Sequence, residues 1–306
     1  MKVKEYLEGI KNGEISILSK AITLIESSRE KDRKKANSLI DLCLKENRQS
    51  KIICVSGPPG VGKSTFINCL GSYLLKKNKV AILAIDPSSK KSKGSILADK
   101  TRMSEISNHD NVFIRPSPNQ GKLGGINKNT NESIILCETF GFNIIIIETV
   151  GVGQSEINAH SISDCFILLT LPKSGDKIQA IKKGILEFAD IIIIHKSDTI
   201  KKIELQKEKN YFSDMFNKNK IIKTFSSIES VNIEQIWKEI QKISLNSNKK
   251  NKQIDLLHDA IKEELEREFY KNEKIKNEIN NLKNKIKMSN MNIKKVAKKL
   301  VNIFLK

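Results

Sequence analysis

One short stretch of the sequence has the residue types and spacing of a phosphate-binding loop. It satisfies the pattern G-x-x-x-x-G-K-[ST] and reads Gly57-Pro58-Pro59-Gly60-Val61-Gly62-Lys63-Ser64-Thr65. Glycines let successive backbone N–H groups point at phosphate oxygens, and a following helix adds its positive N-terminus. We expect Lys63 to reach the β- and γ-phosphate oxygens and Ser64 to offer a hydroxyl to Mg²⁺. A glycine-rich turn without a ligand is the alternative, but the predicted strand before it and amphipathic helix after it favour nucleotide binding.

Two carboxylates stand where a phosphate site would need them, at the ends of predicted strands. Asp86 closes the run KVAILAI, Glu148 closes NIIIIE, and turn residues follow each. Carboxylates so placed could hold a metal ion or position a water molecule, whereas a capping or surface role is the alternative. Asp99 in ILADKTR carries a less specific signal, because a helix-borne Asp beside Lys is usually a solvated pair. The sequence therefore predicts a metal shell that contains Asp86 and Glu148.

A second polar group follows the buried run Ile191–Ile194 and reads His195-Lys196-Ser197-Asp198. The order resembles the Asn-Lys-x-Asp of guanine pockets, with His in the first position. In such a pocket the Asp accepts hydrogen bonds from the guanine N1–H and 2-amino group, a donor pair that adenine lacks. We therefore expect Asp198 to carry a guanine preference, Lys196 to cover a ring face, and His195 to offer a ring N–H in place of an amide. A strand-end His that only packs is the alternative.

The elements that must position these groups can also be predicted. Short apolar runs rich in β-branched residues alternate with helical patterns between residues 51 and 244. These runs are KIICVS, KVAILAI, NVFIRP, FNIIIIE, CFILLTL, DIIIIH and KIIKTFS. Near-continuous apolar strands separated by helices are typical of a parallel sheet that is covered on both faces. The predicted fold is α/β, a doubly wound and mostly parallel sheet of the P-loop type.

We predict three parts in the chain: an N-terminal helical extension over residues 1–48, the phosphate-loop domain over 49–245, and a C-terminal helical arm over 252–306. Helical spacing without strand signals covers residues 3–47, and the polar segment 246–252 reads as a linker. The arm carries apolar stripes at helical spacing, the first being Ile254, Leu257, Ile261, Leu265 and Phe269. Such helices could pack on their own core or on a second copy of the chain, and spacing leaves both open.

The composition narrows the functional classes. The formal net charge is +19, which would suit an anionic partner, but the lysines are dispersed and aromatic residues make up only 5%. A solvated lysine-rich surface is the alternative, and we expect no specific nucleic-acid partner. The five cysteines form no C-x-x-C pair, so neither a zinc site nor a disulfide framework is indicated and a reducing compartment fits.

No membrane association is expected from the sequence. The apolar runs are far shorter than the ~20 residues that a spanning helix needs. The N-terminal segment MKVKEYLEGIKNGEIS has neither the apolar core of a signal peptide nor the composition of a transit peptide. We therefore expect the cytoplasm as the compartment.

Longer segments carry a family resemblance. They are DPSSKKSKGSILADKTRM, FIRPSP, LGGINKNTNESIILCE, IIETVGVGQSE and AIKKGILEFAD. These segments resemble the MeaB/ArgK group of P-loop GTPases, the chaperones of adenosylcobalamin-dependent acyl-CoA mutases. The similarity runs from about residue 10 through the tail, and residues 51–198 hold its most specific part.

The resemblance implies a dimeric GTPase that binds methylmalonyl-CoA mutase or a close relative, gates cofactor loading and protects the mutase. It implies GTP or GDP with Mg²⁺ as ligands, the phosphates lying on residues 57–65. It also implies that four side chains lie around the Mg²⁺ ion and the attacking water: Ser64, Asp86, Asp99 and Glu148. The turn Ser226-Ser227-Ile228 stands where the family has a Ser-Ala-x turn over the base.

One loop departs from the family pattern. Residues 171–182 resemble a mobile segment through which such proteins sense nucleotide and partner. Four of its residues stand where the family usually has small or acidic residues and Gly: Lys173, Ser174, Lys177 and Ala180. Coupling to a partner through this loop is therefore an expectation that rests on the resemblance alone.

Two other functions remain as alternatives. A GTPase that delivers a metal to an enzyme should carry a Cys/His ligand cluster, whereas His109, His160 and His258 are isolated from the cysteines in sequence. A basic nucleic-acid-associated protein should carry a stripe of charge, whereas the lysines are scattered.

Overall fold

The computed structural model describes most of the chain. The described residues are 1–86, 103, 105–118, 125–149, 159–172, 183–215, 220–228, 232–245, 249–288 and 292–305. They form two compact units, Met1–Lys252 and Gln253–Lys306.

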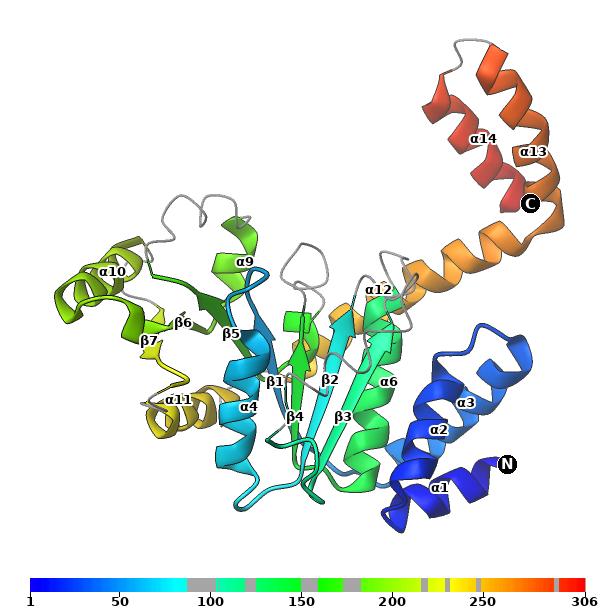
Figure 1. Cartoon of the computed structure of the whole chain (residues 1–306). Coiled ribbons are helices and arrows are strands. Elements are labelled where there is room, and N and C mark those ends of the chain that lie inside the picture. The colour runs from blue at the N-terminus through cyan, green and yellow to red at the C-terminus, as the bar shows by residue number, and fades with distance from the viewer. Residues whose placement is uncertain are drawn as a thin grey trace. The chain divides into compact units, whose positions relative to one another are not determined.

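The first unit is built on a seven-stranded sheet within the described residues (Figure 1). Its strands run in the order β3-β2-β4-β1-β5-β6-β7, and neighbouring strands pair in parallel. Their bounds are β1 Lys51–Ser56, β2 Val80–Asp86, β3 Val112–Pro118, β4 Ile144–Glu148, β5 Cys165–Thr170, β6 Ile191–His195 and β7 Ile221–Phe225. Each strand coincides with one of the seven apolar runs, and β2 and β3 extend one and two residues beyond theirs, so the predicted parallel sheet is confirmed.

Helices cover both faces of this sheet. The helices that follow its strands are α4 Lys63–Leu74, α6 Gly125–Phe140, α9 Lys183–Phe188, α10 Lys202–Met215 and α11 Ile233–Leu245. Alternate residues of β6 show why both faces need cover: Ile191 and Ile193 join one buried cluster, while Ile192 and Ile194 join another. A strand that is apolar at every position buries both of its faces, so the doubly wound arrangement follows from the sequence.

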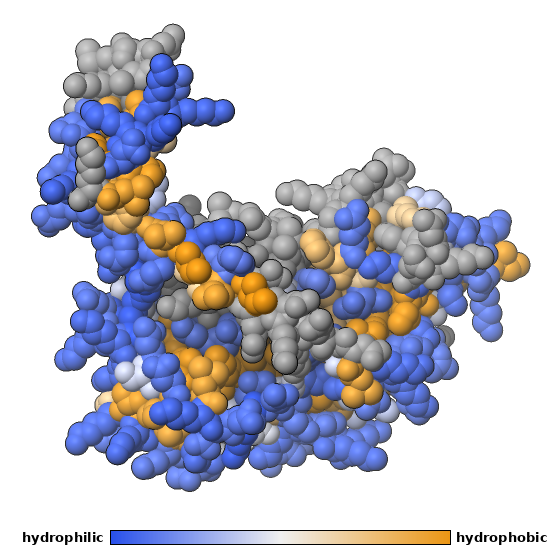
Figure 2. Space-filling model, turned by 180° about the vertical axis from the view of Figure 1, so that it is seen from behind, coloured by the Kyte–Doolittle hydropathy of each residue, from blue (hydrophilic) through white to orange (hydrophobic). Residues whose placement is uncertain are grey.

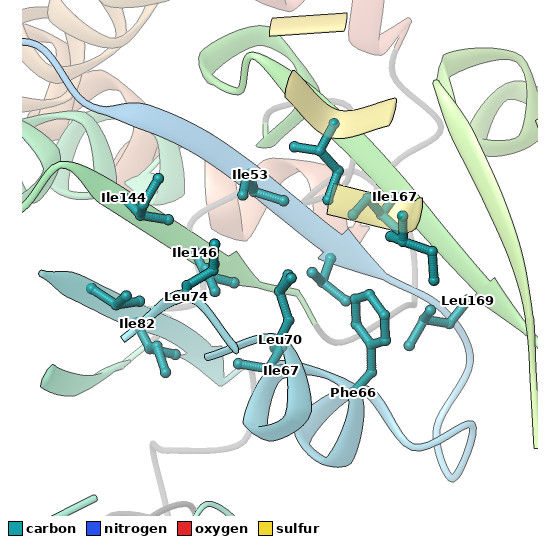
Figure 3. Close-up of a cluster of buried hydrophobic side chains, with 14 of the residues drawn as sticks. Ile53, Phe66, Ile67, Leu70, Leu74, Ile82, Ile144, Ile146, Ile167 and Leu169 are labelled. Atoms are coloured by element: carbon teal, nitrogen blue, oxygen red, sulfur yellow. The ribbon is translucent and has the colours of Figure 1, made fainter. Parts of the chain in front are cut away.

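The larger cluster fixes the helix that follows the phosphate loop. Figure 3 shows Phe66, Ile67, Leu70 and Leu74 of α4 directed toward the strand residues Ile53, Ile82, Ile144, Ile146, Ile167 and Leu169. The four helix residues recur at helical spacing and are at most 1% exposed. The N-terminus of α4 is therefore held rigidly at the carboxyl end of the sheet.

Three helices precede the sheet, as the helical spacing of residues 3–47 predicted. Helices α1 Val3–Lys11, α2 Ile15–Ile25 and α3 Glu30–Leu44 pack on one another and on α6, beside the β3 edge (Figure 1). Arg115 of β3 and Glu26 form an ion pair of 2.6 Å that joins this layer to the edge strand. Apolar residues at helical spacing line the inner face of this layer: Leu42 is half-buried, and Ile22, Ile25, Leu39 and Cys43 are buried.

The second unit is helical. It contains most of α12 Lys249–Lys271, together with α13 Glu273–Met288 and α14 Ile293–Phe304. Phe269 packs edge-to-face on Phe304, with ring centroids 5.3 Å apart, and Ile275 is fully buried. Helix α12 begins inside the segment that was predicted as a polar linker, because Lys, Asn and Gln continue a helix at low cost and no Gly or Pro interrupts them.

The apolar stripe of α12 lies on the surface of the single chain. Its members Ile254, Leu257, Ile261 and Leu265 are 55%, 59%, 46% and 57% exposed. Figure 2 shows hydrophobic surface along this helix.

Candidate nucleotide-binding site

The phosphate-loop motif joins β1, the central strand, to α4. Its backbone turns through left-handed conformations that favour glycine: Gly57 has φ 147° and Gly62 has φ 97°. A Cβ atom on Gly57 would lie 2.6 Å from the carbonyl oxygen of Leu169 in β5. The motif therefore needs glycine here both for its turn and for close contact with the neighbouring strand.

Lys63 is the first residue of α4, and its ammonium folds back on the loop. Its Nζ donates to the carbonyl oxygens of Gly57 at 2.8 Å and Pro58 at 3.2 Å. The positive charge thus lies among loop carbonyls at the N-terminus of a helix. Both the charge and the helix end favour an anion at this position.

Ser64 and Glu148 meet beside the loop. The Ser64 hydroxyl donates to Glu148 Oε1 at 3.0 Å. The sheet register explains the contact, because Glu148 in β4 pairs with Val55 of β1, just before the loop, and with Ala84 of β2. Hydroxyl and carboxylate oxygens are hard ligands that suit Mg²⁺, so the donors present fit that ion.

The other two predicted metal ligands are only partly located. Asp86 ends β2, the strand beside Glu148, but its side chain and the whole of Asp99 lie outside the described residues. Within those residues, no group of three or more His, Cys, Asp and Glu side chains is placed to hold a metal ion.

His195 lies between the phosphate loop and the turn after β7. Its Nδ1 is 2.6 Å from the Val61 carbonyl oxygen, and its Nε2 is 2.6 Å from Ser227 Oγ. The ring is 1% exposed and stacks on Phe225, with centroids 5.6 Å apart. Burial is the main cause that lowers its pKa, and the hydrogen bond to Val61 opposes this shift.

Lys196 and Asp198 follow at the spacing of a guanine pocket. Lys196 adopts a left-handed conformation, φ 57° and ψ 41°, which turns the chain out of β6, and its Nζ donates to Gly60 O at 3.5 Å. The carboxylate of Asp198 is exposed, and hydrogen bonds from the buried Ser226 hydroxyl and from its own backbone N–H lower its pKa. Asp198 is therefore an ionised acceptor at neutral pH.

The turn after β7 completes this arrangement. Ser226 is buried, Ser227 is half-buried against His195, and Ile228 is 86% exposed. The carbonyl of Ser227 lies 4.0 Å from the thiol sulfur of Cys69 in α4, a long hydrogen bond. The turn thus has contacts with both β6 and α4.

Two aromatic residues beneath the site were not predicted from the sequence. The ring of Phe225 stacks on that of His195. Phe66 of α4 packs edge-to-face on Phe225, with ring centroids 5.2 Å apart. The sequence places Phe66 on the apolar face of the predicted helix after the phosphate loop and Phe225 at the end of the last predicted strand, but it does not show that their rings meet under His195.

The loop 171–182 is described only at Leu171 and Pro172, so the predicted coupling segment lies outside the described residues. Among the helices that the structure describes, none combines the length and apolar character needed to cross a bilayer.

A phosphate loop after the central strand of a parallel α/β sheet places the chain in the P-loop class of nucleotide-binding proteins. The family is equally well defined. A family model described as "Methylmalonyl Co-A mutase-associated GTPase MeaB" matches residues 18–303, and the chain belongs to this family. The resemblance inferred from the sequence segments is therefore confirmed.

Curated relatives agree with this membership. A probable GTPase of Mycobacterium tuberculosis is 47% identical over 190 residues, which are 62% of this chain and 56% of the relative. The mitochondrial methylmalonic aciduria type A homolog of Mus musculus is 47% identical over 201 residues, 62% of this chain and 48% of the relative. The GTPase ArgK of Escherichia coli is 42% identical over 195 residues, 63% of this chain and 59% of the relative. The chain thus spans about half the length of the curated relatives it matches.

A solved structure resembles nearly the whole chain. The crystal structure of a LAO/AO transport system kinase superposes with a TM-score of 0.73 and 26% sequence identity. The match covers 99% of this chain and 98% of that one, so it includes the helices before and after the sheet.

Proposed function

We propose that the chain binds GTP and hydrolyses it in an Mg²⁺-dependent reaction. One observation carries this proposal: the phosphate loop is in contact with the segment His195–Asp198, which would bind the base. Lys196 Nζ donates to Gly60 O at 3.5 Å, and His195 binds the Val61 carbonyl at 2.6 Å. A nucleotide that lies across this junction would have its phosphates on the loop and its base beside Asp198.

Asp198 would supply the choice of base. An ionised carboxylate can accept from both the N1–H and the 2-amino group of guanine, whereas adenine offers no such pair. The low pKa of Asp198, caused first by the Ser226 hydroxyl, supports this role because it keeps the acceptor charged. The stem of Lys196 would cover one face of the base.

Lys63, Ser64 and Glu148 would act on the phosphates. Lys63 would exchange the carbonyls of Gly57 and Pro58 for β- and γ-phosphate oxygens. Ser64 and Glu148 would hold Mg²⁺, together with Asp86 and Asp99, and the bound ion would neutralise developing phosphate charge. Glu148 would also orient the attacking water by accepting its hydrogen bond.

We propose that the client of this chain is an adenosylcobalamin-dependent acyl-CoA mutase. The chain would control the loading of the cofactor into the mutase and protect the mutase. The description of the family as mutase-associated supports this. Intrinsic hydrolysis should be slow and the client should accelerate it, as GTPases of this class often gain transition-state charge from a partner. All five cysteines are free thiols, which suits the reducing cytoplasm.

We propose in addition that the chain dimerises through the arm of residues 252–306. Four large apolar side chains lie exposed on one face of α12: Ile254, Leu257, Ile261 and Leu265. An exposed apolar stripe of this length is typical of a helix that packs against a partner. A second copy of the chain offers the same stripe, so a two-fold symmetric contact would cover both.

Titration calorimetry with GTP and ATP tests the nucleotide assignment. Wild-type protein should prefer GTP, Asp198→Ala should bind both nucleotides with similar affinity, and Lys63→Ala should bind neither. Equal affinity of the wild type for ATP would overturn the guanine assignment and leave an ATPase on the same phosphate loop.

A separate experiment tests the client. The untagged protein should co-purify with a corrinoid-dependent mutase from its source, and the purified mutase should raise the rate of GTP hydrolysis. Intrinsic turnover near ~10 s⁻¹ without any partner, a rate typical of unassisted enzymes, would argue against the chaperone role.

A further inference from the structure

The two ring nitrogens of His195 are both used by protein groups. A carbonyl oxygen only accepts hydrogen bonds, so Nδ1 carries the proton and donates to Val61 O at 2.6 Å. In the neutral ring Nε2 is then an acceptor, and the Ser227 hydroxyl donates to it at 2.6 Å. No ring nitrogen is left to contact a nucleobase.

The ring is also fixed by close packing. A Cβ atom on Gly62 would lie 2.5 Å from His195 Cε1, so the ring rests directly on the backbone of the phosphate loop. On another side it stacks on Phe225 at an interplanar angle of 16°. Phe225 in turn contacts Phe66 of α4. The imidazole therefore has little freedom to rotate away from its two hydrogen bonds.

The two groups that His195 joins belong to segments far apart in the sequence. Val61 lies in the phosphate loop, 134 residues before His195. Ser227 lies 32 residues after His195, in the turn Ser226–Ile228 that follows β7, here called the base turn. We infer that His195 is a positioning residue, which holds the phosphate loop and the base turn in the spacing that one nucleotide spans, and does not read the base. This inference rests on the proposed binding of a guanine nucleotide.

A prearranged spacing raises the affinity only of ligands that contact both segments. A nucleoside diphosphate would touch the loop with its phosphates and the turn with its base, so ordering both segments in advance lowers the entropic cost of binding. Pyrophosphate contacts the loop alone and gains nothing from the position of Ser227. Because His195 makes no base contact, its removal should weaken different nucleoside diphosphates by one common factor.

Titration calorimetry on the full chain with Mg²⁺ separates these effects, using GDP, IDP, ADP and pyrophosphate. IDP lacks the 2-amino group of guanine and therefore reports contacts at that edge. His195→Ala should weaken GDP and IDP equally, on the order of tenfold, and change pyrophosphate affinity less than about twofold. His195→Asn, whose amide nitrogen can donate and whose amide oxygen can accept, should restore GDP affinity to within about threefold of wild type.

Two further measurements keep the inference testable if His195→Ala is unstable. Ser227→Ala retains the ring but removes one of its partners, and it should weaken GDP without weakening pyrophosphate. A long-range ¹H–¹⁵N spectrum of the wild type should show a neutral His195 ring with its proton on Nδ1.

Several outcomes would overturn the inference. A change in the GDP to IDP ratio in His195→Ala would mean that His195 reads the base. A parallel loss of pyrophosphate in both variants would indicate a general loss of structure, and a proton on Nε2 would contradict the bond to Val61.

If the proposed function is wrong, the affinities of the wild type for the nucleotides show it. A wild type that binds ADP as tightly as GDP would remove the guanine assignment, while an equal loss of both in His195→Ala would still support positioning. A wild type that binds no nucleoside diphosphate would overturn both.

Discussion

At the scale of single residues, Glu148 is a carboxylate whose charge can be removed without a change of shape. In the wild type, the Ser64 hydroxyl donates to Glu148 Oε1 at 3.0 Å. Glu148→Gln keeps an oxygen that can accept this hydrogen bond but loses the negative charge that would orient Mg²⁺ or water. We expect GTP to bind while its hydrolysis slows by at least about 100-fold, as is typical when a positioned acid or base is lost. Single-turnover hydrolysis of bound GTP measures this.

Glu187→Gln on α9 is the matched control, because it makes the same chemical change at an exposed position outside the site. It should hydrolyse GTP at the wild-type rate. Wild-type turnover in Glu148→Gln as well would remove Glu148 from the reaction.

His195 gives the stability of the protein a dependence on pH. Burial lowers the pKa of its imidazole from 6.5, while the neighbouring charges of Lys196 and Asp198 act in opposite directions. The unfolded chain therefore takes up a proton at a higher pH than the folded one. Above pH 6.5, the pKa of the unfolded chain, the neutral His195 ring makes its full contribution to the free energy of unfolding. This contribution falls as the pH drops toward the lower folded pKa, by about 1.4 kcal/mol for each pH unit between the two pKa values.

Urea unfolding between about pH 7.5 and 5.5 measures this effect, with His195→Asn as the control because an amide does not titrate. The free energy of unfolding should fall more steeply on acidification for the wild type than for the variant. Parallel curves would show that the folded ring protonates as readily as an exposed one.

The residues of the site differ in how far the sequence could predict them. Lys63, Ser64 and Asp198 belong to short motifs in which spacing along the chain fixes the chemistry, so they could be identified before the structure. The partners of His195 could not, because Val61 and Ser227 come near it only when the carboxyl ends of β1, β6 and β7 meet. His195 also stands where an Asn is expected, and the residues around it in the sequence do not indicate which groups hydrogen-bond to its ring nitrogens.

At the scale of elements, α4 connects the hydrophobic core with the phosphate loop. Leu70 is fully buried in the cluster under this helix. Leu70→Ala should lower the free energy of unfolding by about 2–5 kcal/mol, because it removes apolar atoms that folding buries away from water and leaves a cavity in their place. Ser72→Ala, at an exposed position of the same helix, should change it by less than about 0.5 kcal/mol.

Denaturant unfolding of both variants tests whether the helix is held by its buried face. Equal effects of the two substitutions would mean that the core does not fix α4. A cavity at Leu70 should also weaken nucleotide binding, since the N-terminus of α4 carries Lys63 and Ser64.

Most elements could be predicted because their signals are local. An apolar run such as IIIIH must bury both faces, which leaves a parallel central position as the stable solution. The start of α12 could not be predicted, because a polar segment reads equally well as a linker or as the exposed first turns of a long helix. Its continuation into the apolar stripe decides in favour of the helix.

At the scale of the whole molecule, the exposed stripe of α12 predicts the oligomeric state. Ile261→Glu would place a charge on each of two facing helices and should raise the dimer dissociation constant by at least about 100-fold, because each dimer loses two buried side chains. The neighbouring Ala260→Glu adds the same charge off the stripe and should leave the dimer intact. Analytical ultracentrifugation of the full chain distinguishes them.

A monomeric wild type at micromolar concentration would rule out this dimer. Equal dissociation of both variants would instead place the contact elsewhere on the arm.

The strand order also determines when the protein can fold during its synthesis. Among the strands that the structure describes, β1 pairs with β4 and β5, and about 90 residues separate its end from Ile144. At about 5–20 residues per second, both edges of β1 therefore remain unpaired on the ribosome for roughly 5 to 20 s. During that interval the runs KIICVS and KVAILAI are available to wrong partners, including neighbouring nascent chains on the same message. Ribosome-bound chains that end before Ile144 should therefore be cleaved by protease within β1, and chains that extend past Thr170 and have left the exit tunnel should resist. Slower translation before β4 should reduce the yield of folded protein even though no residue has changed.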